Sequence, residues 1–125
     1  MVDLHPAMTG HLEAVTQDAE RLRELWAPDG VLEFPYASGE MTSRIEGVER
    51  LVAYFGGARR WGGWTFEGVR TVEDPARRLY VAELHATAEW VETGKPYVQD
   101  YVIWMTLDED GRIQSWREYW DKDRV

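Results

Sequence analysis

The sequence predicts one α+β domain, in which helices from the N-terminal half gather at one side of an antiparallel sheet. Apolar residues in the first half recur at steps of three and four, the period of a helix with one buried stripe. The second half instead has four apolar or alternating runs separated by turn sequences, which is typical of an antiparallel meander. Because 125 residues is the length of one domain, we expect a single unit spanning residues 1–125.

The first predicted helix ends at Pro28, with Asp29-Gly30 as its turn. Asp18 could also cap a second, shorter helix, so two helices with a bend near Gln17 are an alternative. The buried stripe of this segment consists of Met8, Leu12, Val15, Ala19, Leu22 and Trp26.

A short strand is expected at residues 31–36, and a polar loop leads from it to Glu46. A second apolar stripe, formed by Leu51, Val52 and Phe55, predicts a helix over residues 48–55. The glycine pair that follows Phe55 ends it.

Four strands are predicted in the second half, at about residues 64–73, 78–91, 97–107 and 112–121. The gaps between them carry turn signals, namely Asp74-Pro75, the segment 92–95 and the segment 108–111. If Leu107 pairs with Arg112, Glu118 lies opposite Tyr101. If Val91 pairs with Pro96, Ala86 also lies beside Tyr101. A one-residue bulge would exchange the two faces of the sheet.

Strand alternation places Trp116, Glu118 and Trp120 on one face of the last strand. This face is apolar enough to be the one covered by the helices, and its small alanines beside bulky aromatic residues indicate a cavity. Loss of hydration there should raise the pKa of Glu118 and make it a competent acid or base near neutral pH. A buried glutamate satisfied by Tyr101 or by a backbone group is the structural alternative.

Composition narrows the classes of partner. The formal charge of −9 repels nucleic acid phosphates and anionic lipid headgroups, so neither a nucleic acid nor a membrane partner is expected. The chain has no cysteine, and its three histidines lack metal-ligand spacing. We therefore expect a cytoplasmic protein with no metal and no cofactor.

Several stretches carry a family resemblance, namely LWAPDGVLEFP, IEGVERLVAYF, TGKPYVQDYVIWMTLDEDGRI and REYWD. In this order they resemble the nuclear transport factor 2 and SnoaL-like superfamily. The resemblance covers essentially the whole chain and implies a cone-shaped barrel, in which the curved sheet surrounds a central apolar pocket. It also implies no single activity, because that fold carries isomerases, cyclases, dehydratases, epoxide hydrolases and non-catalytic binders.

The family resemblance also limits the reaction. The positions that correspond to the ketosteroid isomerase catalytic groups hold Phe34, Ile103 and a residue on or near Gly10, so that route is not expected. Of the charged groups in the epoxide hydrolase pattern, this sequence retains only one carboxylate, at Glu118. In the PhzA/PhzB-like pattern, Arg117-Glu118 matches the strand that carries the acid-base glutamate, whereas the positions of the histidine and serine fall near Tyr54 and Ala58.

These considerations predict a small-molecule enzyme that acts on an aromatic or polycyclic carbonyl compound by cofactor-free proton transfer, as a cyclase, dehydratase or isomerase. The candidate catalytic residues are Glu118, Tyr101 and Tyr54. The candidate substrate-binding residues are Trp26, Phe34, Phe55, Phe66, Ala86, Ala88, Gln99, Ile103, Trp116 and Trp120. A non-catalytic small-molecule-binding or interaction domain is the alternative function.

Arg59 and Arg60 are expected at the pocket mouth or, alternatively, as a solvated basic pair. The opposite face of the sheet carries Val102, Trp104 and Tyr119 among charged groups. We expect this face to form a homodimer, because it would otherwise leave an exposed apolar patch. His85 is predicted on the same face, although another register would turn it into the pocket.

Overall fold

The N-terminal helical segment is divided by a bend. The computed structural model describes residues 2–125, and its first helix is α1 (Pro6–Gln17). Asp18 is extended, and its side chain accepts a hydrogen bond from the Glu20 amide at the start of η1 (Ala19–Arg21), which continues into α2 (Leu22–Leu25). The alternative of a bend near Gln17 is therefore confirmed, and an uninterrupted helix to Pro28 is wrong.

Trp26 starts a strand instead of ending a helix. Strand β1 (Trp26–Glu33) includes the predicted Asp29-Gly30 turn as an irregularity between Trp26 and Val31. A Cβ atom on Gly30 would lie only 2.5 Å from the Trp26 ring, so glycine lets the strand pass over the indole. The chain continues through β2 (Arg44–Glu46) to α3 (Val48–Phe55), which has the predicted bounds.

The second half forms four long strands, as predicted. They are β3 (Trp61–Asp74), β4 (Leu79–Trp90), β5 (Pro96–Leu107) and β6 (Ile113–Trp120), with the short helices η2 (Pro75–Arg77) and η3 (Lys122–Arg124) after β3 and β6. The sheet order is β2-β1-β6-β5-β4-β3. Every pair is antiparallel except β1 with β6, so the sheet is mixed and not wholly antiparallel.

The predicted register was wrong by two residues at both hairpins. Ile103, not Tyr101, lies opposite Glu118, because pairing starts with Leu107 and Ile113 and a bulge then leaves Gln114 without a partner. On the other side Ala86 pairs with Gln99, because a longer connection follows Glu89. Since side chains alternate with a period of two, a shift of two leaves every residue on its predicted face.

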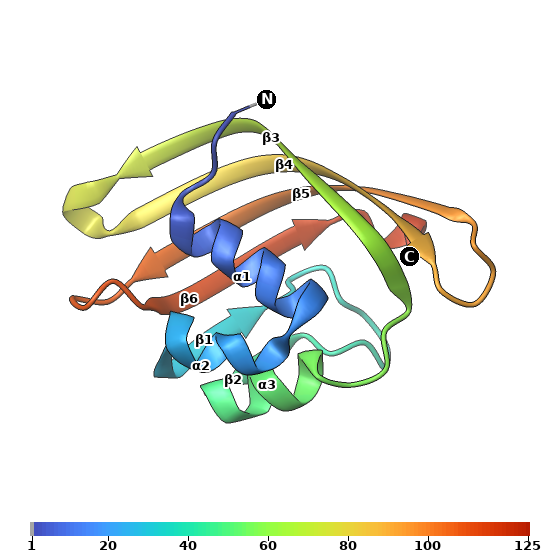
Figure 1. Ribbon diagram of the computed structural model, residues 1–125. Coiled ribbons are helices and arrows are strands. Elements are labelled where there is room, and N and C mark those ends of the chain that lie inside the picture. Colours follow the sequence, from blue (N-terminus) through green and yellow to red (C-terminus); the bar gives the residue numbers. More distant parts are fainter. Residues whose placement is uncertain (1) are drawn as a thin grey trace.

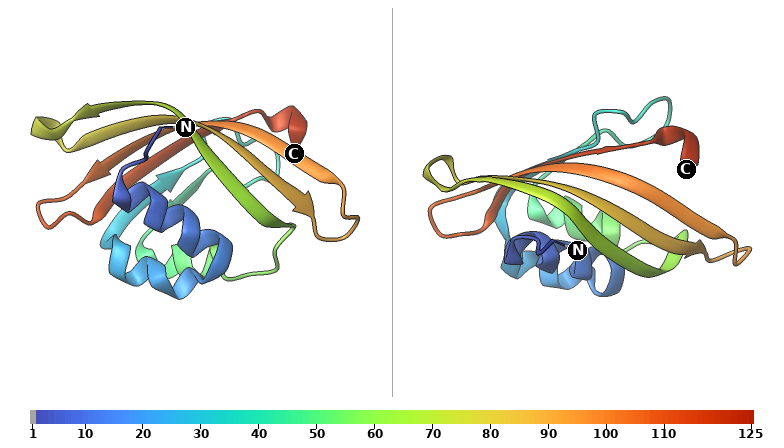
Figure 2. Two further views of the ribbon diagram at one scale, coloured as in Figure 1. Left: turned by 45° about the horizontal axis from the view of Figure 1, so that its top comes forward. Right: turned by 90° about the horizontal axis from the view of Figure 1, so that it is seen from above.

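The helices pack on the concave side of the sheet, which curves over them (Figures 1 and 2). The apolar core lies in this layer, where Trp26, Trp116, Leu22, Leu51, Ile103 and Met105 are fully buried. The fold is α+β, as predicted. No helix within residues 2–125 is long and apolar enough to cross a membrane.

Candidate functional site

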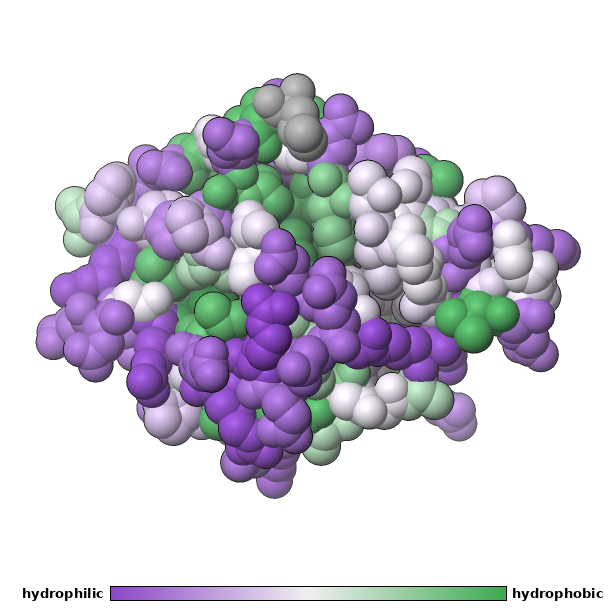
Figure 3. All heavy atoms as spheres, in the orientation of Figure 1, coloured by the Kyte–Doolittle hydropathy of each residue, from purple (hydrophilic) through white to green (hydrophobic). Residues whose placement is uncertain are grey.

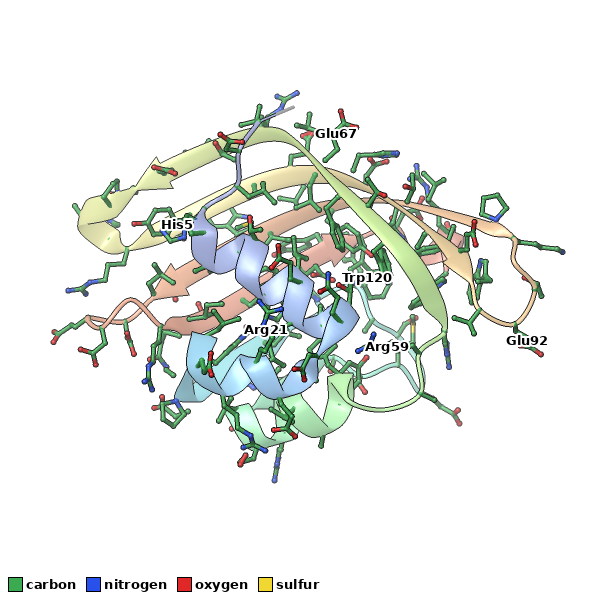
Figure 4. The ribbon with its side chains drawn as sticks, viewed as in Figure 1. His5, Arg21, Arg59, Glu67, Glu92 and Trp120 are labelled. Atoms are coloured by element: carbon green, nitrogen blue, oxygen red, sulfur yellow. The ribbon has the colours of Figure 1, made fainter. Side chains whose placement is uncertain are left out.

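A cavity of about 640 Å³ opens between the concave face of the sheet and the helices. Its walls come from α1, α3, the loop after β1, the segment 57–60, and strands β3, β5 and β6. Figure 3 shows green, hydrophobic residues and pale residues of intermediate hydropathy gathered beside the purple, hydrophilic surface of the helices. Figure 4 shows Arg59 and Trp120, two of the lining residues, between α1 and β3.

Glu118 is the carboxyl group inside this cavity. It projects from β6 and is only partly exposed, and its Oε1 accepts a hydrogen bond from Trp116 Nε1 at 3.1 Å. Burial raises the pKa of Glu118 to about 7, against the smaller lowering effect of that hydrogen bond. At neutral pH the group can therefore both donate and accept a proton.

Two phenol groups line the cavity with Glu118. Burial raises the pKa of Tyr101, and the negative charge of Glu118 raises it further. The pKa of Tyr54 is raised for the same two reasons, whereas the positive charge of Arg60 acts in the opposite direction. Both phenols therefore stay protonated near neutral pH and can donate hydrogen bonds to a ligand oxygen.

Aromatic rings form the remaining walls. Trp120 contacts Phe34, with 6.0 Å between ring centroids, on the side of β6 and the loop after β1. On the opposite wall Trp61 stacks on Tyr97 at 4.7 Å, and Trp64 stacks on Phe66 at 5.3 Å. Aromatic side chains commonly line small-molecule binding pockets.

Charged residues lie at the mouth. Arg59, Arg60 and Glu40 belong to the lining, and both arginines are also exposed to solvent. The Arg59 guanidinium donates a hydrogen bond to the Thr16 carbonyl oxygen near the end of α1, which ties the segment 57–60 to the helix.

The structure divides the predicted site residues into two groups. One group lines the cavity: Glu118, Tyr101, Tyr54, Phe34, Phe55, Phe66 and Trp120. The other group lies in the core or the sheet behind the lining: Trp26, Ala86, Ala88, Gln99, Ile103 and Trp116. Gln99 is fully buried, and its amide bonds Tyr97 Oη and the backbone of Asp100 and Asp121.

His11 is the main lining residue that the sequence reasoning missed. It is buried in α1, and its Nδ1 accepts a hydrogen bond from Trp26 Nε1 at 2.9 Å. Burial lowers the pKa of His11 to about 3. Its position, three residues after Met8 and four before Val15, lies on the apolar stripe, and this signal could have identified it.

His85 lies on the outer face of the sheet, away from the cavity. Its Nδ1 is 2.8 Å from Asp100 Oδ1, and Arg124 pairs with the other oxygen of the same carboxylate. The hydrogen bonds with His85 and Arg124 lower the pKa of the Asp100 carboxyl group. Among residues 2–125 no group of three or more His, Cys, Asp or Glu side chains is arranged to hold a metal ion.

A larger and more open groove of about 1050 Å³ lies on the outer face, between the loop after β1 and the ends of β5 and β6. Glu83, Val102 and Tyr119 line it. Glu118 is absent from its walls, so the smaller inner cavity is the candidate reaction site.

Comparisons with known proteins agree with this architecture. The chain is 30% identical to protein YesE of Bacillus subtilis over 106 residues, which are 84% of this chain and 71% of that protein. It is 31% identical to a PhzA/B-like protein of Pseudomonas aeruginosa over 104 residues, 83% of this chain and 73% of that protein.

Among solved structures, the protein RV0760c of Mycobacterium tuberculosis, in complex with estradiol-17β-hemisuccinate, superposes with a TM-score of 0.73 at 22% identity. That superposition covers 94% of this chain and 93% of the other, and at this identity it shows a shared fold. The family model described as "SnoaL-like domain" matches residues 9–116, and the chain therefore belongs to the SnoaL-like domain family.

Proposed function

We propose that the protein binds a flat aromatic or polycyclic carbonyl compound in the cavity and transfers a proton on it with Glu118, without a cofactor. One observation carries the proposal. Glu118 is a carboxyl group inside an aromatic cavity, and burial brings its pKa to about 7. An acid-base group is most effective when its pKa lies near the working pH.

The neighbouring groups suit this chemistry. Tyr101 or Tyr54 would donate a hydrogen bond to the carbonyl oxygen and stabilise the negative charge that develops when Glu118 removes an adjacent proton. Return of the proton to a different carbon completes an isomerisation. In a cyclisation the carbanion instead attacks a second carbonyl carbon of the same ligand, whose oxygen takes the proton, and in a dehydration the proton goes to a β-hydroxyl group that leaves as water. The steroid ester bound by the structurally similar mycobacterial protein supports a polycyclic ligand for this cavity shape.

The test uses 2-tetralone, a bicyclic ketone whose α protons exchange with solvent. Proton NMR in D₂O measures their replacement by deuterium with wild type, Glu118→Gln and Glu89→Gln, the last an exposed strand glutamate as matched control. Wild type and the control should accelerate exchange over buffer by about 10²-fold or more, and Glu118→Gln should remove the acceleration. Equal rates for wild type and Glu118→Gln would contradict the proposal.

Binding of 2-tetralone without acceleration by wild type would favour the alternative function, a non-catalytic binding domain. Quenching of tryptophan fluorescence measures that binding separately, because Trp61, Trp64 and Trp120 line the cavity.

We also propose that two copies of the chain pair through the outer face of the sheet. Trp104 is 45% exposed there and Val102 is 37% exposed. The same face carries acidic groups, such as Glu83 and Asp100, beside the basic Arg117 and Arg124. A two-fold axis would bring this patch against its own copy, so that apolar groups are covered and opposite charges meet.

A further inference from the structure

His11 is a polar side chain in an apolar setting at the inner wall of the cavity. His11 is 2% exposed, and its ring packs on the Trp116 ring with 4.0 Å between the two centroids. The Phe55 ring meets it edge-on at 5.8 Å, and Trp26 lies at 5.6 Å. Burial of an imidazole among such rings is costly unless both ring nitrogens find partners.

One ring nitrogen has its partner, and that partner determines where the proton lies. An indole N–H can only donate, so the 2.9 Å contact from Trp26 Nε1 requires His11 Nδ1 to be an unprotonated acceptor. Burial keeps the ring neutral at physiological pH, since the pKa of His11 falls to about 3. A neutral ring with a bare Nδ1 carries its proton on Nε2.

The Nε2–H group is a donor without an acceptor. No protein acceptor for it is found within residues 2–125. Among the same residues, Trp61 Nε1 is the sole fully enclosed side-chain nitrogen or oxygen that lacks a hydrogen-bond partner, so His11 Nε2 is not fully enclosed. His11 Nε2 therefore keeps its access to the cavity that the residue lines. A ligand oxygen that reaches this donor forms a hydrogen bond with it, whereas a ligand without an acceptor excludes water from the donor and leaves it unpaired.

Trp116 places this donor close to the acid-base group. The Trp116 ring packs against the His11 ring at a tilt of 33°, and its Nε1–H donates a hydrogen bond to Glu118 Oε1 at 3.1 Å. The histidine and the carboxyl group thus contact the same fully buried indole, and both line the same cavity.

We propose that His11 Nε2–H is a second ligand-recognition donor of the cavity, in addition to the Tyr101 or Tyr54 hydroxyl group, and favours ligands that present a neutral carbonyl oxygen to it. This inference rests on the proposed function, which accounts for a ligand beside Glu118. The hydrogen bond from His11 would then orient the carbonyl group of that ligand. A carboxylate would form a stronger hydrogen bond with this N–H, but it would lose its hydration in the apolar cavity, and a neutral ring, unlike an imidazolium, offers no opposite charge to compensate. Ammonium and hydrocarbon groups at this position leave the donor unpaired, which selects against them.

The test compares 2-acetylnaphthalene with 2-ethylnaphthalene, two probes of nearly equal shape of which only the first has a carbonyl oxygen. Dissociation constants from tryptophan quenching should favour the ketone by about tenfold in wild type. His11→Phe should abolish that preference and still bind the hydrocarbon. His5→Asn is the matched control, because His5 caps the far end of α1 from Arg59 (Figure 4) and asparagine can replace its cap.

Two-bond ¹H–¹⁵N NMR on the wild type gives a second readout that does not depend on the stability of any variant. It should show His11 as the neutral Nε2–H form, with an Nε2 shift that moves on addition of the ketone and not of the hydrocarbon. An Nδ1–H form, an imidazolium, or an unchanged ketone preference in His11→Phe would overturn the assignment. Equal affinity of wild type for the two probes would contradict only the role of His11, whereas binding of neither would contradict the cavity and the proposed function.

Discussion

Replacement of Glu118 by glutamine should make the protein more stable at alkaline pH and leave its stability at acid pH nearly unchanged. The folded carboxyl has a pKa of about 7, against an ordinary value of 4.5. Below pH 4.5 both folded and unfolded states hold the proton, so Glu118 then imposes no charge penalty. As pH rises the unfolded state ionises first, and the folded state loses relative stability until its own pKa is passed.

The size of the effect follows from this shift. A rise from 4.5 to about 7, at about 1.4 kcal/mol per pKa unit, corresponds to a loss of about 3 kcal/mol of unfolding free energy between pH 4.5 and pH 7. Above pH 7 the loss should level off. Glutamine cannot ionise, keeps the shape of the side chain, and still offers an oxygen to the Trp116 indole.

Urea unfolding followed by circular dichroism, at half-unit steps from pH 4 to pH 8.5, measures the effect. The difference in unfolding free energy between wild type and Glu118→Gln cancels the titration of the other groups and should grow by about 3 kcal/mol over that range. Glu89→Gln, which replaces an exposed strand glutamate outside the cavity lining, is measured in the same way as the matched control. A constant difference for Glu118→Gln would refute the reasoning, since the Glu118 carboxyl would then titrate as it does in the unfolded chain.

Three further predictions concern the interface, the fold and the cavity. Trp104→Glu should convert a dimer to a monomer in light scattering without loss of the circular dichroism spectrum, and a wild type that is already monomeric at tens of micromolar, about the range of a specific weak dimer, would contradict it. Gly30→Ala should lower the unfolding free energy by about 1–3 kcal/mol, because the new Cβ would lie 2.5 Å from the Trp26 ring; an unchanged urea midpoint would argue against the tight packing. Trp120→Ala should weaken 2-acetylnaphthalene binding about tenfold or more, measured by calorimetry, while unaltered affinity would exclude Trp120 from the site.

Local pattern alone determined much of this architecture. The three- and four-residue spacing of Leu51, Val52 and Phe55 predicted α3 with its observed bounds, since a helix buries one stripe. The two-residue period of β6 was enough to place Trp116, Glu118 and Trp120 on the inner face. Both predictions depend on the direction of side chains within one element, which the order of residues dictates directly.

Tertiary structure alone decided which of the inward residues meet. The unpaired Gln114 set the register that puts Ile103 opposite Glu118, and a bulge of this kind depends on how neighbouring strands twist together. The same packing placed Ala86 and Gln99 behind the lining and brought His11, from a helix more than a hundred residues earlier in the chain, onto the indole that binds Glu118. Such contacts join elements distant in sequence, and no local periodicity encodes them, because they arise only when the sheet closes over the helices and excludes water from the space between.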